Sequence, residues 1–160
     1  MSKKNIFIMI TVSLLLVAAC SGGGGGGGGA TKAVVTLLSS GTGTICAVDV
    51  TVDLPAGVTL KSSASGETDN GVVVPSGAAA TNTYTVGVYS AATGTSPARV
   101  RVLMVNAAGF QPGEFCAVNA DLAPGYSPVA SDFTIVSFLA SDETGSVING
   151  MTAGLTVDIR

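Results

Sequence analysis

The feature that most constrains the fold of this chain is an alternation of apolar and polar residues at every second position. Over 45–54 the even-numbered positions are all apolar, and the odd-numbered positions include Asp49 and Asp53. The same alternation recurs over 115–122 and over 155–159. A period of two is typical of β-strands that bury one face, so these three segments are predicted strands.

Further segments have the composition of short strands, namely 33–38, 71–74, 84–89, 99–105 and 133–139. Turn signals rich in Gly, Pro and Asn separate them. About eight short strands at this spacing predict an all-β fold, either a sandwich or a barrel. We expect the first and last strands to pair and close the sheet. Residues 127–132 are predicted to form one helical turn, capped by Ser127 with Pro128 at its first position.

The first twenty residues have the order of features found in an export signal. Lys3 and Lys4 precede an apolar run over 6–17, which is too short for a permanent membrane span. The following V-A-A-C, ending at Cys20, resembles the bacterial lipobox. That resemblance implies cleavage before Cys20, lipidation of its thiol and acylation of the new amino terminus. An ordinary signal peptide with a coincidental cysteine, or a short membrane anchor, is the alternative.

Ser21 and eight glycines follow Cys20, and such a run has no side chains to bury. The predicted organisation is a signal peptide over 1–19, a lipidated cysteine and Gly-rich tether over 20–31, and a β-domain over 32–160. A Ser after the lipidated Cys, by resemblance to enterobacterial sorting rules, implies the outer membrane. The sequence leaves open whether the domain faces the periplasm or the outside.

Composition excludes several kinds of function. The chain has no His, which excludes histidine general bases, Ser-His-Asp hydrolysis and His-ligated metals. Loss of residues 1–19 removes Lys3 and Lys4, leaving five basic against ten acidic residues and a side-chain charge of −5. An acidic domain of this kind argues against a nucleic-acid partner.

Several segments resemble the cohesin family. An early cohesin strand and its corner resemble the sequence C-A-V-D-V-T-V-D-L-P-A-G-V at 46–58. Later cohesin strands resemble the segments at 98–102, 106–110 and 113–122, and the loop before the last strand resembles S-D-F-T-I at 131–135. The similarity covers about 33–160. It implies an antiparallel jelly-roll β-sandwich of eight or nine strands, immunoglobulin-like in appearance and akin to cellulose-binding modules.

Cohesins bind dockerin modules, so the resemblance implies a protein-binding domain. A lone, lipid-anchored domain without an attached catalytic module departs from that setting, and favours a cohesin-like fold over true dockerin binding. We expect a non-catalytic adhesion module at the cell envelope, with an envelope or secreted protein as partner. The alternative is a polysaccharide-binding module of the same fold linked to polysaccharide breakdown. No nucleophile–base pair or metal-ligand cluster is visible, so we expect no enzyme, cofactor or metal site.

Cys46 and Cys116 both belong to the apolar face of their strands by the alternation. The exported compartment permits oxidation, and the cohesin-like arrangement implies that the two strands are neighbours. We therefore expect a disulfide between them. Two buried free thiols and, less favoured, a redox-active pair are the alternatives.

Four residues are candidate ligand contacts. Arg99 and Arg101 share a strand face and would contact an acidic partner, although pairing with Asp49 or Asp121 is the simpler account. Sugar binding usually relies on exposed aromatic rings. We expect Tyr89 and Tyr126 to be exposed, and Tyr84 to lie in the core with Val86 and Val88. The sequence Asp142-Glu143-Thr144-Gly145 is interpreted as a turn, with a calcium loop as the alternative.

Overall fold

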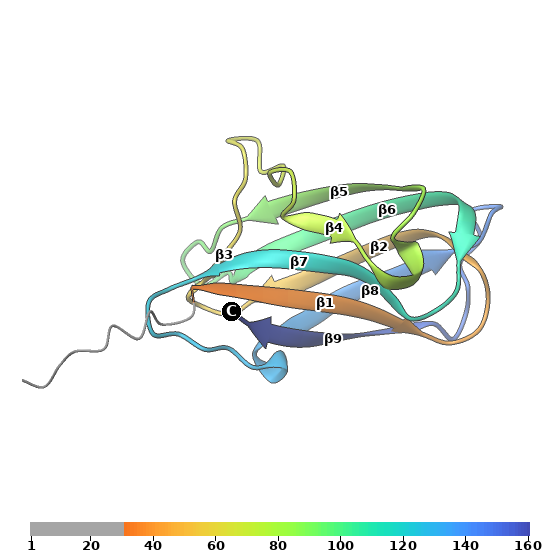
Figure 1. Ribbon diagram of the computed structural model, residues 1–160. Coiled ribbons are helices and arrows are strands. Elements are labelled where there is room, and N and C mark those ends of the chain that lie inside the picture. Colours follow the sequence, from red (N-terminus) through yellow and green to blue (C-terminus); the bar gives the residue numbers. More distant parts are fainter. Residues whose placement is uncertain (1–30) are drawn as a thin grey trace, which may run out of the picture.

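Nine strands and two short 3₁₀ turns make up most of residues 31–160, the part of the chain that the structure, a computed structural model, describes (Figure 1). The strands are β1 (Lys32–Ser40), β2 (Ile45–Leu54), β3 (Val58–Thr59), β4 (Val73–Pro75), β5 (Thr83–Ser90), β6 (Ala98–Phe110), β7 (Glu114–Leu122), β8 (Thr134–Ser141) and β9 (Thr152–Ile159). The 3₁₀ turns are η1 (Gly77–Ala79) and η2 (Ala130–Asp132). The predicted signal peptide, tether and lipidated Cys20 lie outside the described residues.

The strands form two antiparallel sheets stacked as a sandwich (Figure 1). Sheet A has the order β3-β7-β1-β9, with β4 also paired to β7, and sheet B has the order β5-β6-β2-β8. The predicted all-β antiparallel sandwich is therefore confirmed. The expected pairing of first and last strands is confirmed, because Lys32 and Arg160 exchange backbone hydrogen bonds of 3.1 and 2.9 Å where β1 meets β9. The expectation that this pairing closes the sheet is wrong, since β9 is the last strand of sheet A.

The core lies between the sheets and consists of the inward side chains of the alternating strands. In β2 the inward Val48, Val50 and Val52 are at most 2% exposed. Opposite them in sheet A, Leu37 and Phe115 are fully buried. Each fully buried side chain of this size contributes about 1.5–3 kcal/mol relative to exposure, so the strict alternation fixes which face of each strand is inside.

A bulge interrupts the pairing of β2 with β6 at one end of the sandwich. Ile45 lies opposite Phe110 and Ala47 lies opposite Val105, so four β6 residues stand against Cys46 alone. The buried Asn106 side chain holds this bulge by donating 2.8 Å and 2.9 Å hydrogen bonds to Thr83 and Thr81 and accepting one from the Ala108 amide. The alternation of β2 changes phase here, since Ile45 and Val48 are both buried.

The helical turn predicted over 127–132 is present but shorter and differently capped. η2 covers three residues, and the backbone amide of Val129 donates a 2.9 Å hydrogen bond to the Asp132 carboxylate. Ser127 is therefore not the cap. Within residues 31–160 no helix has the length and apolar character needed to cross a bilayer.

Candidate functional site

The outer face of sheet B brings together residues from all four of its strands. Cross-strand partners in an antiparallel sheet point to the same side, so the register defines rows across this face. One row contains Ser90, Arg99, Asp53 and Thr134, and a parallel row contains Val86, Leu103, Asp49 and Leu139. We call this surface the outer face of sheet B.

Two arginine–aspartate pairs cross this face between β6 and β2. Arg99 binds Asp53 through two hydrogen bonds of 2.6 and 3.1 Å. Arg101 binds Asp49 in the same two-pronged way, at 2.9 and 2.5 Å. Planar guanidinium groups match carboxylates in this geometry, so the two pairs fix the orientation of all four side chains.

These hydrogen bonds shift the ionisation of the paired groups. Hydrogen bonding from Arg101 lowers the pKa of Asp49 below its ordinary value, against a smaller opposing effect of burial. Hydrogen bonding to the carboxylates raises the pKa of Arg99 and of Arg101. The hypothesis that an arginine pairs with Asp49 is confirmed for Arg101, whereas Asp121 pairs instead with Lys32 in sheet A.

Exposed apolar side chains gather beside these ion pairs on the same face. We call them the apolar patch: Tyr84, Val88, Leu103, Val105 and Leu139. Tyr84 is 72% exposed and stands opposite Val105, which is 55% exposed. A shallow hollow of about 400 Å³, lined in part by Val88, Arg99 and Arg101, connects the patch with the ion pairs.

The structure overturns the expected roles of the tyrosines. Tyr84 is exposed rather than in the core, while Tyr89 and Tyr126 are half-buried and pack against the core. The physical reason is that the outward face of β5 is its more apolar face, with Tyr84, Val86 and Val88, so its alternation predicts the wrong side as buried. The inward face carries Thr83, Thr85, Gly87 and Tyr89. The phase is instead readable from β6, where Arg99 and Arg101 must point outward and place Leu103 and Val105 on the same side.

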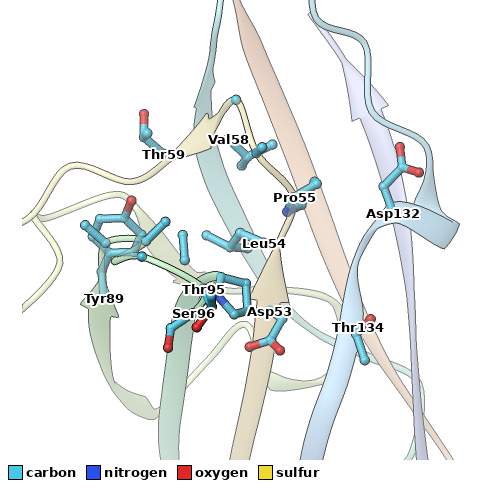
Figure 2. A pocket seen from close by; sticks show the side chains of 17 residues that line it. Asp53, Leu54, Pro55, Val58, Thr59, Tyr89, Thr95, Ser96, Asp132 and Thr134 are labelled. Atoms are coloured by element: carbon cyan, nitrogen blue, oxygen red, sulfur yellow. The ribbon is translucent and has the colours of Figure 1, made fainter.

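Tyr89 belongs to a second candidate site, an end pocket of about 660 Å³. This end pocket lies where β2 and β5 end and where β6 and β8 begin. Figure 2 shows Leu54 between Tyr89 on one side and Asp132 and Thr134 on the other. Hydroxyls of Thr59, Thr95, Ser96 and Thr134, together with the carboxylates of Asp53 and Asp132, contribute the polar part of its lining.

Tyr126 supports this end pocket without lining it. Its ring lies against Gly57, where an added Cβ would come within 3.0 Å of the ring. Gly57 has a φ of 92°, which glycine adopts freely. The loop after β2 therefore closes tightly over Tyr126 and leaves Gly57 in the wall of the pocket.

The two cysteines do not form the expected disulfide, and both are free thiols. Their strands belong to different sheets, β2 to sheet B and β7 to sheet A, so the expectation that the strands are neighbours is wrong. The bulge in β6 also removes Cys46 from the regular alternation, and Cys46 lines a pocket of about 450 Å³ with Ala107 and Ala108. Cys116 is fully buried, and this burial raises the pKa of its thiol to about 12.

The acidic segment at Asp142 forms a tight turn. Its Oδ1 accepts hydrogen bonds from the Thr144 amide, the Thr144 hydroxyl and the Ser146 amide at 2.7–3.0 Å. These bonds lower the pKa of Asp142. Across residues 31–160 no group of three or more His, Cys, Asp or Glu residues is placed to hold a metal ion.

Comparisons of the chain with protein-family models, with curated proteins and with solved structures gave no match. The outer face of sheet B and the end pocket are therefore the features from which a function can be inferred.

Proposed function

We propose that this chain is a non-catalytic, cohesin-like adhesion module of the bacterial cell envelope that binds a protein partner on the outer face of sheet B. The observation that carries the proposal is the apolar patch beside the two arginine–aspartate pairs. Exposed apolar clusters rimmed by polar groups mark interaction sites on soluble domains.

The residue types on this face favour a protein partner. Tyrosine and arginine are enriched among the residues that contribute most to protein–protein binding, and most of the Tyr84 side chain is exposed. The arginines are already paired, so their carboxylate partners neutralise them and the face is electrostatically mixed. A partner with an apolar centre and a polar rim, such as an envelope or dockerin-like protein, matches this distribution.

A charge placed in the apolar patch tests the proposal. Wild-type protein and the variant Val105→Asp are used as bait for envelope extracts, and captured proteins are identified by mass spectrometry. Val129→Asp is the matched control, because Val129 is similarly exposed, at 58%, but lies outside sheet B. We expect one protein to be captured by wild type and by Val129→Asp and lost with Val105→Asp. Equal capture by all three baits contradicts the proposal.

The membrane anchor is a separate part of the proposal. The V-A-A-C motif supports lipidation of Cys20, with the glycine run as a tether that concentrates the domain at the outer membrane. We expect a radiolabelled fatty acid to be incorporated into wild type and not into Cys20→Ser. We also expect globomycin to cause the uncleaved precursor to accumulate. Cleavage of the leader without acyl label identifies an ordinary signal peptide instead.

A polysaccharide-binding module is the second candidate, and the end pocket supports it. Tyr89 places an aromatic ring in a pocket whose other polar groups are hydroxyls and carboxylates, a combination suited to sugar C–H faces and hydroxyl groups. A glycan array with wild type, Tyr89→Leu and Tyr84→Leu separates the two candidates. Binding lost only with Tyr89→Leu favours polysaccharide, and binding lost with neither variant removes the end pocket from consideration. Reproducible polysaccharide hydrolysis by the purified protein contradicts the non-catalytic assignment.

A further inference from the structure

Among residues 31–160, β9 is an edge strand of sheet A and pairs with β1 alone. Lys32 and Arg160 exchange both of their backbone hydrogen bonds, and antiparallel pairs alternate between bonded and non-bonded positions. Thr152, Gly154, Thr156 and Asp158 therefore direct their amide and carbonyl groups toward β1. The amides and carbonyls of Ala153, Leu155, Val157 and Ile159 point away from the sheet, and no other strand within 31–160 pairs with them.

The same four residues also have incompletely covered side chains. Ala153, Leu155, Val157 and Ile159 face the space between the sheets, but each is only half-buried. Across that space Ile135 and Phe138 of β8 are half-buried as well. In Figure 1, β8 and β9 are the outermost strands of their sheets on the same flank of the sandwich.

Whereas η2 contacts β9 without pairing with it as a strand, the opposite flank of the sandwich is covered by backbone hydrogen bonds. There, residues preceding β4 cover the edge of β5, since the Thr68 amide donates to Gly87 and the Tyr89 amide donates to Gly66, at 2.9 and 2.7 Å. Soluble proteins commonly protect free edges with Lys, Pro or a bulge. β9 contains no Lys or Pro, and its register with β1 is continuous over eight residues.

We propose that β9 pairs with β9 of a second copy of this chain, in antiparallel orientation about a two-fold axis that passes beside Thr156. This register places Leu155 opposite Val157 of the second copy, and Ala153 opposite Ile159 of the second copy. All four outward-directed residues of each strand then lie in bonded pairs, and the two β-sandwiches share one continuous sheet.

The side chains of β9 are complementary to themselves in this register. On the side that faces the space between the sheets, the small Ala153 lies opposite the larger Ile159 of the second copy at each end of the β9–β9 contact. Leu155 and Val157, which are closer in size, lie opposite each other near its centre. On the outer side, Thr156 meets Thr156 of the second copy, a favourable cross-strand pair. Asp158 lies opposite Gly154, so the two Asp158 carboxylates are about 13 Å apart at 3.3 Å per residue and do not repel at close range.

This pairing is independent of the proposed partner site. β9 belongs to sheet A, whereas the apolar patch lies on the outer face of sheet B. A two-fold pair joined through β9 would therefore leave both outer faces of sheet B uncovered and present two copies of the patch.

The oligomeric state of the full chain in detergent tests the proposal. Sedimentation analysis should give twice the monomer mass for wild type. Thr156→Lys places two ammonium groups opposite each other at the axis and should reduce the mass to that of a monomer. Thr36→Lys is the matched control, because Thr36 is the direct neighbour of Thr156 in β1 and lies away from the seam. We expect Thr36→Lys to keep the wild-type mass.

Cysteine cross-linking tests the register in the membrane. In a Cys46→Ser background, Thr156→Cys should form an intermolecular disulfide, because non-bonded antiparallel pairs bring the two Cα atoms within disulfide range. Gly154→Cys and the parent without a new cysteine should not. A monomeric wild type overturns the proposal, and slow hydrogen exchange of the Ala153, Leu155, Val157 and Ile159 amides in that monomer would show that another part of the same chain covers the β9 edge. Retention of the dimer in Thr156→Lys also overturns it.

Discussion

The ring of Phe115 in β7 has its centroid 6.2 Å from that of Phe138 in β8, with the ring planes tilted by 35°. The two residues belong to different sheets, so this aromatic contact joins the layers of the sandwich. Phe115 is fully buried, while Phe138 is only half-buried beside the open flank between β8 and β9. Loss of the Phe115 ring should therefore destabilise the core more than loss of the Phe138 ring.

Replacement of Phe115 by Ala is expected to lower the free energy of unfolding by about 3–5 kcal/mol, because it leaves a cavity between the sheets. Phe138→Ala should cost less, since part of its ring is already in contact with solvent. Urea denaturation followed by circular dichroism measures both. An equal loss for the two variants would show that the flank at Phe138 is closed in solution.

Substitution of Asp49 should change how stability depends on pH. Its folded-state pKa is lowered, mainly by hydrogen bonding from Arg101, so its contribution is present above the unfolded pKa and is lost as the pH falls through the folded pKa. An exposed ion pair of this kind contributes about 0.2–1 kcal/mol. We expect wild type to exceed Asp49→Asn in stability at neutral pH and the difference to vanish in strong acid, below the lowered pKa. Urea titrations across this acid range test the expectation, and a constant difference contradicts it.

The two free thiols should differ in reactivity. Burial raises the pKa of the Cys116 thiol to about 12, so it stays protonated and covered at pH 8, whereas Cys46 lines a surface pocket. Maleimide labelling of folded protein should modify Cys46 and leave Cys116 unmodified. Unfolding without reductant should make both react. If neither residue reacts after unfolding, the cysteines form the disulfide that the sequence led us to expect.

Gly87 and Gly154 offer a matched pair of strand glycines. An added Cβ at Gly87 would lie 2.5 Å from Thr68 Oγ1 and 2.6 Å from Val73 Cγ2, whereas at Gly154 nothing lies within 4 Å. Gly87→Ala should displace the residues that cover the edge of β5 and destabilise the domain by about 1–3 kcal/mol. Gly154→Ala should be neutral or raise stability by up to about 1 kcal/mol, because it restricts the unfolded chain. Thermal melting of both variants tests this, and similar melting temperatures contradict it.

The sequence predicts most strands because one of their faces is clearly polar. β2 has the predicted bounds, since Asp49 and Asp53 leave only one phase in which its valines are buried. β3 escaped prediction because two residues cannot show a period. Tyr84 was misplaced because it shares the more apolar face of β5 with Val86 and Val88, and that face is the outward one. The register with β6, where Arg99 and Arg101 point outward, shows which side of β5 is exposed.

The cysteine prediction failed for a different reason. Alternation places a side chain correctly only while the register is unbroken, and four residues of β6 stand opposite Cys46 alone. The side chain of Asn106 holds the bulge, but in the sequence Asn106 is only one polar residue in an apolar run, and this pattern does not predict a bulge. The outer face of sheet B was predicted in part, through Arg99 and Arg101, whereas the apolar patch beside them required the assembled sheet.

The end pocket lies close to the point where the described chain begins. The Ala123 amide donates to the carbonyl of pocket-lining Gly57, and the adjacent Leu122 amide donates to Thr31, at 2.8 and 2.9 Å. If Cys20 carries the proposed lipid, this opening is held within reach of the bilayer surface, while the outer face of sheet B runs along the length of the sandwich. Short or membrane-attached molecules would then encounter the pocket first, and large soluble proteins would approach from the side.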